Sequence, residues 1–327
     1  MDRRTFLETL AGGLLARPLA SEAQQAAKVW RIGFVGAETP SLTGHFLAAF
    51  RQGMREHRYV ERETFTVEDR WAGGRNERFR DLITELIRLK VDVLVPLSTQ
   101  GGLAAKGLTT TIPIVFVATD PVGTGLVTSL DRPGGNLTGL SITLGDEFAG
   151  KWLELLREIN RRVSRVAVLG NPTNPANAVY LKAAQVSARK LGAKLQFQGV
   201  TEPGQLDGAF AAMATGRAEG LIVFIDPLTV RYRDRIVELA AQARLPAIYG
   251  FREFSEAGGL MAYGSNVAAL CRRAAVYVDK ILRGAKPGDL PVEQATQFEL
   301  IVNLKTAKSL GLTIPPSLLQ RADQLIE

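Results

Sequence analysis

The sequence contains few of the residues from which metal and catalytic sites are usually built. It has a single cysteine, Cys271, which excludes an intramolecular disulfide and a cysteine-built metal site. Its two histidines, His45 and His57, are twelve residues apart on one predicted helix and lack the spacing of metal ligands. Neither a Gly-x-Ser-x-Gly elbow nor a Walker lysine loop is present. The sequence therefore predicts no metal, no cofactor and no catalytic residue.

Long hydrophobic runs are also lacking. No stretch approaches the roughly 20 apolar residues of a membrane helix. The N-terminus instead has the arginine pair Arg3-Arg4, a short, weakly apolar stretch at 10–16 and small residues around Ala23. This pattern predicts a twin-arginine signal peptide over 1–23, cleaved near Ala23, and a periplasmic protein. The alternative is an amphipathic N-terminal tail.

The charge gives no sign of a nucleic-acid partner. The formal net charge is +7, but basic and acidic residues are interspersed along the chain. The exception is a basic cluster between Arg51 and Arg58 on a predicted helix. We interpret it as a solvated helix face, in preference to a nucleic-acid stripe. With 327 residues, of which 46% are hydrophobic, the chain is long enough for two globular domains.

Strand and helix patterns alternate along the first half of the chain. Apolar runs predict strands, and patterns of helical period predict the intervening helices. This alternation is typical of a parallel sheet with helices on both faces. The predicted strands are 29–36, 65–71, 91–97, 112–118 and 137–142, and the predicted helices are 42–56, 76–89 and 100–108.

The same pattern then begins again. Arg31–Gly36 is echoed by Arg165–Gly170, 134 residues later, and Ile112–Val115 by Leu245–Ile248, 133 residues later. A helix at 267–282, a strand at 298–302 and a final helical pair exceed one repeat. The sequence therefore predicts an α/β protein of two similar doubly wound parallel-sheet lobes, joined by a multi-strand hinge that the chain crosses more than once.

A turn after the predicted strand at 112–118 carries a hydroxyl and a carboxylate, Thr119 and Asp120, followed by Pro121. Ligands of open parallel sheets bind at the carboxyl ends of the strands. The two side chains are therefore site candidates. The alternative is an Asx-type turn in which they only hold backbone.

Three segments resemble the ABC-transporter substrate-binding protein family of the TrpX-like type: Thr119–Gly123, Asn303–Leu312 and Ile314–Asp323. The resemblance extends over residues 28–327. It implies a type I periplasmic binding protein that is a monomer, holds a small polar ligand between two closing lobes and delivers it to an ABC permease in the inner membrane. The first lobe would contain 28–142 and 267–292, and the second 143–266 and 293–327. Characterised relatives bind aromatic amino acids, so an amino acid is one candidate ligand.

The resemblance also implies which loops line the cleft. The ligand-binding candidates are Glu38, Ser98, Thr99, Gln100, Thr119 and Asp120 in the first lobe, and Asn171, Asp226 and Tyr249 in the second. A helix start at 98–99 could hold a carboxylate, and Asp120 or Asp226 could pair with an ammonium. Tyr249 or Phe251 could cover an apolar part of the ligand. Purely structural roles remain open as alternatives: Ser98 and Asn171 could be helix caps, Asp226 a turn residue and Tyr249 a core residue.

Two other functions fit a two-lobed α/β fold. A two-lobed enzyme such as a glycosyltransferase also closes over a cleft, and it is the alternative that we retain. A sugar-responsive repressor would need a DNA-binding helical domain at the N-terminus, where this chain has the predicted signal.

Overall fold

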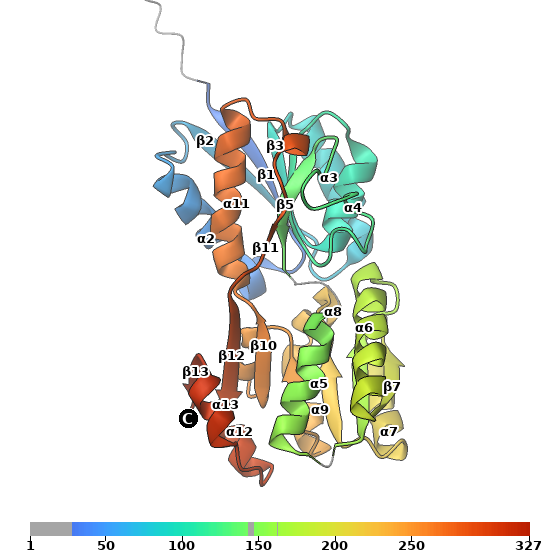
Figure 1. Ribbon diagram of the computed structural model, residues 1–327. Coiled ribbons are helices and arrows are strands. Elements are labelled where there is room, and N and C mark those ends of the chain that lie inside the picture. Colours follow the sequence, from blue (N-terminus) through green and yellow to red (C-terminus); the bar gives the residue numbers. More distant parts are fainter. Residues whose placement is uncertain (1–27, 143–146, 162) are drawn as a thin grey trace, which may run out of the picture.

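The computed structural model describes residues 28–142, 147–161 and 163–327, so the predicted signal peptide lies outside the described residues. Two α/β lobes are stacked end to end, and the N-terminal part of the chain lies in the upper lobe of Figure 1. The described part contains no helix that is both long and apolar enough to cross a membrane.

The first lobe is built on a sheet with the strand order β11-β5-β4-β3-β1-β2. All its neighbouring strands are parallel. Its central strands are apolar and buried on both faces, as expected for a parallel sheet covered by helices. The strands are β1 (Trp30–Gly36), β2 (Phe65–Trp71), β3 (Val93–Leu97), β4 (Ile114–Ala118), β5 (Leu137–Ser141) and β11 (Glu293–Gln294).

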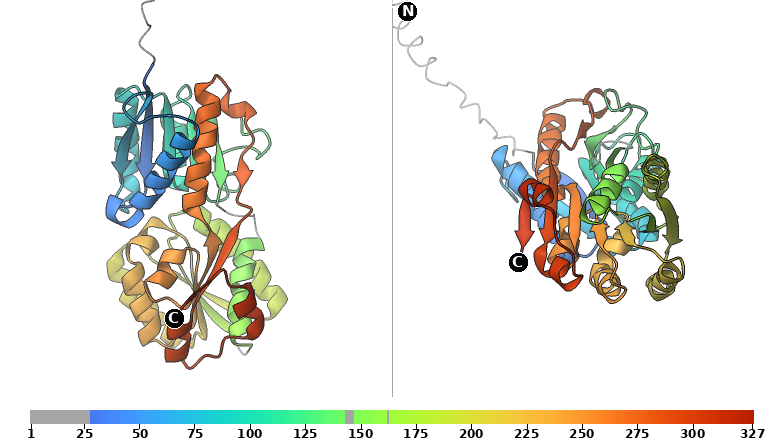
Figure 2. Two further views of the ribbon diagram at one scale, coloured as in Figure 1. Left: turned by 90° about the vertical axis from the view of Figure 1, so that its left-hand side faces the viewer. Right: turned by 60° about the horizontal axis from the view of Figure 1, so that its bottom comes forward.

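Two pairs of helices cover this sheet. Helices α2 (Pro40–Glu56) and α11 (Val267–Leu282) bury Phe50 and Ala274 in one core against one face. Helices α3 (Phe79–Arg88) and α4 (Thr99–Leu108) cover the other face. Figure 2 shows α11 beside α2, although more than 200 residues separate them in the sequence. The predicted helix at 76–89 begins as a 3₁₀ turn, Asn76–Arg78, before α3.

The second lobe repeats this arrangement. Its sheet has the order β13-β12-β10-β9-β8-β6-β7, in which β7-β6-β8-β9-β10 repeats the order β2-β1-β3-β4-β5. The repeat predicted from the strand spacing is thus confirmed. The strands are β6 (Arg165–Gly170), β7 (Lys194–Gly199), β8 (Gly220–Val223), β9 (Ala247–Tyr249), β10 (Met261–Ser265), β12 (Phe298–Asn303) and β13 (Gln324–Ile326), of which β12 runs antiparallel to β10.

Helices again lie on both faces of the second sheet. Helices α5 (Glu147–Ile159) and α6 (Pro175–Leu191) pack around Trp152 and Tyr180 on one face. Helices α7 (Leu206–Thr215) and α9 (Arg233–Gln242) cover the other. Short helices complete the lobe: α8 (Pro227–Arg231), α10 (Arg252–Glu256), α12 (Leu304–Ser309) and α13 (Pro316–Arg321).

The chain passes between the two sheets three times: after β5, after β10 and after β11. Strand β11 pairs with β5 through Glu293 and Gln294, so the last crossing follows residue 294 and not residue 292 as predicted. A two-residue strand is too short to show the alternating pattern by which strands are recognised in a sequence. Strand β13, only three residues long, was missed for the same reason.

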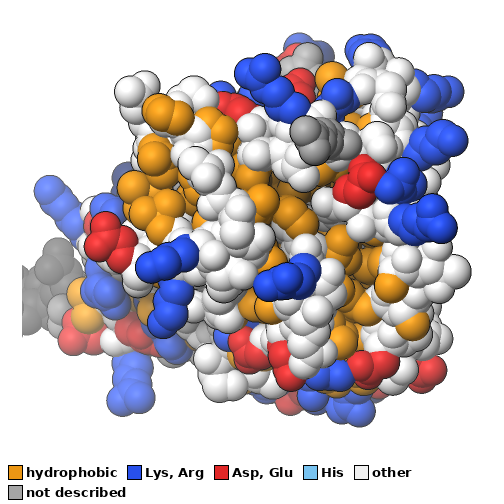
Figure 3. Space-filling model, turned by 90° about the horizontal axis from the view of Figure 1, so that it is seen from below, with side chains coloured by type: hydrophobic (Ala, Val, Ile, Leu, Met, Phe, Trp, Pro, Cys, Tyr) orange, Lys and Arg blue, Asp and Glu red, His pale blue; other side chains and the backbone are white. Residues whose placement is uncertain are grey.

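Basic side chains of the predicted basic helix and its neighbours form pairs with acidic side chains. On the predicted basic helix, Arg51 Nε donates to Glu61 Oε1 at 3.1 Å, and Arg272 of α11 bonds to Glu56. At the lower end of the second lobe, Lys and Arg side chains alternate with Asp and Glu around apolar patches (Figure 3). Arg55 and Arg58, at the end of the predicted basic helix, are exposed, which fits its interpretation as a solvated face.

Candidate ligand-binding site

A cavity lies between the two lobes, where loops at the carboxyl ends of both sheets face one another. This is the position at which open parallel sheets bind ligands. The first lobe contributes Ala37, Glu38, Leu42, Thr43, Phe46, Leu97, Ser98, Thr99, Gln100, Val117, Thr119, Ile142 and Val267, and the second contributes Asn174, Ile225, Asp226, Pro227, Val230, Phe251 and Glu253.

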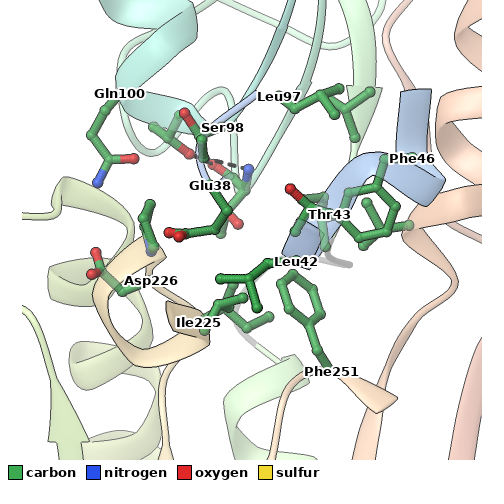
Figure 4. A pocket seen from close by; sticks show the side chains of 18 of the residues that line it. Glu38, Leu42, Thr43, Phe46, Leu97, Ser98, Gln100, Ile225, Asp226 and Phe251 are labelled. Carbon is green, nitrogen blue, oxygen red and sulfur yellow. Dashed lines mark hydrogen bonds between the residues drawn. The ribbon is translucent and has the colours of Figure 1, made fainter. Parts of the chain in front are cut away.

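The cavity has a polar end and an apolar end. In Figure 4, Glu38, Gln100 and Asp226 lie on one side, whereas Phe46 and Phe251 lie on the other. None of the described lining residues is a lysine or an arginine. The arrangement suits a small molecule with a polar head, including a cationic group, and an apolar body.

Glu38 follows β1 and is 2% exposed. Neither of its carboxylate oxygens has a hydrogen-bond partner within the described part of the protein. Burial raises the pKa of Glu38 from 4.5 to about 8; the positive charges of Arg231 and Arg233 oppose this rise, and the nearby Asp226 adds to it. A buried carboxyl without a partner is costly, and an incoming cation would remove that cost.

The start of helix α4 supplies donors at the same end of the cavity. Ser98 caps this helix, and its Oγ accepts a hydrogen bond from Gly101 N at 2.9 Å, so the capping alternative for Ser98 is what the structure shows. The amides of Thr99 and Gln100, in the first turn, have no partner within the helix. The Nε2 atom of Gln100 is buried and lacks a partner among the described residues. These donors suit an anionic group such as a carboxylate.

Asp226 caps helix α8 and is 1% exposed. Its carboxylate accepts hydrogen bonds from Leu228 N at 2.8 Å, Asn174 Nδ2 at 2.8 Å and Asn171 Nδ2 at 3.3 Å. Burial raises the pKa of Asp226, and these three hydrogen bonds oppose the rise. Asp226 thus shapes its turn and also lines the cavity.

Six of the nine predicted ligand-binding residues line the cavity: Glu38, Ser98, Thr99, Gln100, Thr119 and Asp226. Thr99 and Thr119 are hydrogen-bonded to each other. The Thr99 hydroxyl donates to Thr119 O and accepts from Thr119 N, each at 3.2 Å. This pair joins the ends of β3 and β4 at the wall of the cavity.

The structure does not bring Asp120 to the cavity. It adopts a left-handed φ of 38°, and its Oδ1 accepts a hydrogen bond from Gly123 N at 3.0 Å. Its carbonyl oxygen accepts from Thr124 N at 3.0 Å and from Thr124 Oγ1 at 2.7 Å. The turn alternative therefore describes Asp120, whose own side chain stabilises a strained backbone.

Asn171 and Tyr249 also lie away from the cavity surface. Asn171 is behind Asp226, where its amide donates to that carboxylate and its Oδ1 accepts from Thr173. Tyr249 is 1% exposed in the core between β9 and α9, and its ring stacks on Phe254 at 4.7 Å between centroids. The core alternative describes Tyr249, because its side chain points from β9 into the lobe.

The apolar end of the cavity was predicted only in part: Phe251, which was expected to cover an apolar part of the ligand, lines the cavity. Phe46 lies on one face of the helix predicted at 42–56, and nothing in the sequence placed it at the cavity that it lines. The start of α11, at Val267, came from a segment far away in the sequence. Only the placement of one lobe against the other turns these side chains into a cavity wall.

Hydrogen-bonded contacts within the described part of the chain connect the lobes around the cavity. The Tyr180 hydroxyl donates to Thr119 Oγ1 at 3.4 Å, and His45 Nε2 lies 3.2 Å from Glu253 Oε1. Arg231 Nη1 donates to the carbonyl oxygen of Gly73. The lobes are therefore in contact across the cleft.

The family model described as ABC transporter substrate binding protein matches residues 37–326. The chain belongs to this family. Substrate-binding proteins of the family are extracytoplasmic, bind small molecules and work with ABC permeases. The two lobes of this chain have the fold of type I periplasmic binding proteins.

Individual relatives agree with this assignment. A tyrosine-binding protein of Clostridioides difficile is 25% identical over 264 residues, which is 80% of this chain and 75% of the relative. The crystal structure of a conserved domain protein from Vibrio cholerae is 28% identical, with a TM-score of 0.86 over 91% of this chain and 100% of that one. The family description and the name of the first relative both indicate binding, which supports binding over the glycosyltransferase alternative.

Two further structures share the fold. A domain in complex with L-Trp from Streptococcus pneumoniae is 24% identical and has a TM-score of 0.85, covering 91% of this chain and 100% of that one. A substrate binding protein with adhesive properties from Clostridium difficile, in a ligand-free, open structure, is also 24% identical and has a TM-score of 0.68, covering 91% of this chain and 99% of that one.

Proposed function

We propose that this protein captures an α-amino acid with a large apolar side chain between its two lobes and delivers it to an ABC permease. The proposal rests above all on Glu38, a buried carboxylate that has no hydrogen-bond partner among the described residues and lies at the polar end of the cavity. An α-ammonium group beside Glu38 would give this carboxylate the partner that it lacks.

The rest of the cavity fits the other two parts of such a ligand. The first-turn amides of α4 and the buried Nε2 of Gln100 would hold the α-carboxylate. Phe46 and Phe251 would lie against the side chain, because aromatic rings favour stacked or edge-to-face contact with other rings. The relatives whose names give a ligand bind tyrosine or tryptophan, which supports an aromatic side chain.

The lobe arrangement is consistent with a ligand-holding, closed state. The TM-score is higher against the L-Trp complex, 0.85, than against the ligand-free, open structure, 0.68. Tyr180, His45 and Arg231 connect the lobes here. Closed lobes enclose the ligand and exclude water from its polar contacts.

The proposal includes a cellular setting. A twin-arginine signal over 1–23, cleaved near Ala23, would export the protein to the periplasm, where it would act as a monomer with its permease. Replacement of both Arg3 and Arg4 by Lys should leave the precursor in the cytoplasm. Unchanged export of that variant would contradict the twin-arginine route.

Titration calorimetry with three related compounds tests the ligand class. L-Tryptophan carries both charged groups, indole-3-propionate lacks the ammonium and tryptamine lacks the carboxylate. L-Tryptophan should bind most tightly. Glu38→Gln should weaken its binding by about 2–5 kcal/mol, the usual cost of removing one partner of a buried charged pair.

The same variant distinguishes a contact with the ammonium from a general defect. Glu38→Gln should change indole-3-propionate binding much less than L-tryptophan binding, because that compound has no ammonium. Glu202→Gln, an exposed glutamate outside the cavity, is the control and should bind like wild type. Equal losses for both compounds, or no binding of L-tryptophan, L-tyrosine or L-phenylalanine to wild type, would contradict the proposed ligand class.

A further inference from the structure

Arg231 lies outside the cavity but reaches across the cleft beside it. It is the last residue of α8 in the second lobe, and its Nη1 donates to the Gly73 carbonyl oxygen of the first lobe. The residue is exposed overall, so its side chain is not part of either hydrophobic core. A substitution at this position should therefore leave both lobes folded.

The loop that Arg231 contacts is bonded to the backbone that carries Glu38. Gly74 N donates to Ala37 O at 2.8 Å, and Gly73 N donates to Glu38 O at 3.4 Å. Movement of the Gly73–Gly74 loop would therefore shift the peptide groups on either side of the Glu38 side chain.

Gly74 allows two side chains from different lobes to approach the same point. Its φ of +73° favours glycine, and a Cβ at this position would lie 2.9 Å from Arg231 Cδ. The same Cβ would lie 3.2 and 3.3 Å from the two carboxylate oxygens of Glu38. Arg231 and Glu38 thus come close to each other on the same side of one glycine.

Helix α8 connects this contact to the cavity. Asp226 at its N-cap and Val230 in its last turn both line the cavity, and Arg231 follows directly. Asp226 is held by two asparagine amides and by the Leu228 amide, so the short helix has a fixed start. A ligand in contact with Asp226 and Val230 would hold α8 where Arg231 reaches Gly73.

We propose that Arg231 is a positioning residue that fastens the closed lobes. It is not among the described residues that line the cavity, but it bonds the cavity-lining helix of one lobe to the loop behind Glu38 of the other. Opening must break this bond before the ligand leaves, so Arg231 slows ligand release. The ligand part of this inference rests on the proposed function.

The test compares the rates of L-tryptophan binding to Arg231→Ala, Arg231→Lys, Arg235→Ala and wild type. Arg231→Ala should raise the dissociation rate about 10- to 100-fold, as expected from the loss of a hydrogen bond with a charged donor. The association rate should change little, because encounter takes place with the lobes open. Arg231→Lys retains a charged donor and should recover part of the loss.

Arg235 provides the matched control. It is a nearby arginine whose guanidinium bonds to Asp207 and Glu238, both within the second lobe. Arg235→Ala should leave both rates unchanged. Equal dissociation rates for wild type and Arg231→Ala, or an equal rise for Arg235→Ala, would overturn the proposal.

A second measurement needs no ligand. Single-molecule energy transfer between dyes on the two lobes measures the closed population of the empty protein, and Arg231→Ala should reduce it. If wild type binds neither L-tryptophan nor L-tyrosine but the closed population falls in Arg231→Ala, the ligand class is wrong and the role of Arg231 stands. An unchanged closed population in that situation would overturn the role of Arg231.

Discussion

The Tyr180 hydroxyl on α6 donates a hydrogen bond across the cleft to the Thr119 hydroxyl, with 3.4 Å between the oxygens. Tyr180 belongs to the core of the second lobe, whereas Thr119 lines the cavity from the first. Thr119 is itself bonded to Thr99 at the start of α4. The contact thus connects the core of one lobe to the proposed carboxylate-binding end of the other.

Tyr180→Phe tests this contact. The ring remains in the core, so the free energy of unfolding should change by less than about 1 kcal/mol, while the dissociation constant for L-tryptophan should rise about 2- to 10-fold. Tyr277→Phe is the control, because the Tyr277 hydroxyl bonds to Pro291 O within the first lobe. The control should leave binding unchanged. Wild-type affinity in Tyr180→Phe would mean that its hydroxyl contributes nothing to closure.

The pH should control closure of the empty protein. With the lobes in contact, as in this structure, the pKa of Glu38 is about 8, whereas in open lobes exposed to water it should return toward 4.5. Closure then takes up a proton between these two values. It is most favourable below pH 4.5 and becomes less favourable, by at most about 1.4 kcal/mol per pH unit, as the pH rises to 8.

Small-angle scattering of the ligand-free protein at pH 5, 7 and 9 measures this effect. The radius of gyration should increase with pH in wild type and stay constant in Glu38→Gln, which has no carboxyl to titrate at this position. Because Asp226, the other buried carboxyl at the cavity, remains in the variant, any pH effect of Asp226 on closure would persist there. A pH dependence that persists in Glu38→Gln would assign the effect to another group.

Asp120 should contribute to stability and not to binding. Asp120→Ala removes the acceptor for Gly123 N, and we expect a loss of about 1 kcal/mol in the free energy of unfolding. Asp120→Asn retains an acceptor and tolerates the left-handed backbone, so it should lose less. Thermal melting and calorimetry with L-tryptophan measure both properties. Weaker binding by Asp120→Ala without a loss of stability would place its carboxylate at the ligand.

The close approach of two backbone segments should make Gly264 intolerant of substitution. A Cβ there would lie 1.7 Å from the Gly250 carbonyl oxygen, where β10 runs beside the end of β9. Gly264→Ala should therefore lower the free energy of unfolding by about 1–3 kcal/mol or more. Gly208→Ala is the control, because a Cβ in this part of α7 meets open space. It should stabilise the protein by about 0.5–1 kcal/mol. A Gly264→Ala variant with wild-type stability would show that the backbone moves apart freely.

Spacing and alternation predicted most of the fold. The offset of about 134 residues between Arg31–Gly36 and Arg165–Gly170 corresponds to β1 and β6, which occupy equivalent places in the two sheets. Strands β11 and β13 escaped prediction because two or three residues carry no periodic pattern. Strand β9 is as short as β13 but was predicted because its segment echoes Ile112–Val115. Whether such a short segment pairs with a strand, and with which one, depends on the lobe in which the segment lies.

The site was predicted in part because strand ends are visible in a sequence and side-chain directions are not. Glu38 and Asp120 both follow buried strands, yet only Glu38 reaches the cavity. Asp120 turns back onto Gly123 because its backbone is left-handed, which the residue type does not specify. Tyr249 ends a three-residue strand, too short for its alternation to show which face the ring occupies.

The three passages between the sheets also set an order in time. The first sheet is completed by β11 and covered by α11, both of which follow most of the second lobe in the chain. As the ribosome synthesises the protein from its N-terminus, residues 28–142 must wait for residues 267–294 before their sheet and core are complete. The two halves of this molecule therefore mature together, and neither can be released as a finished unit before the other.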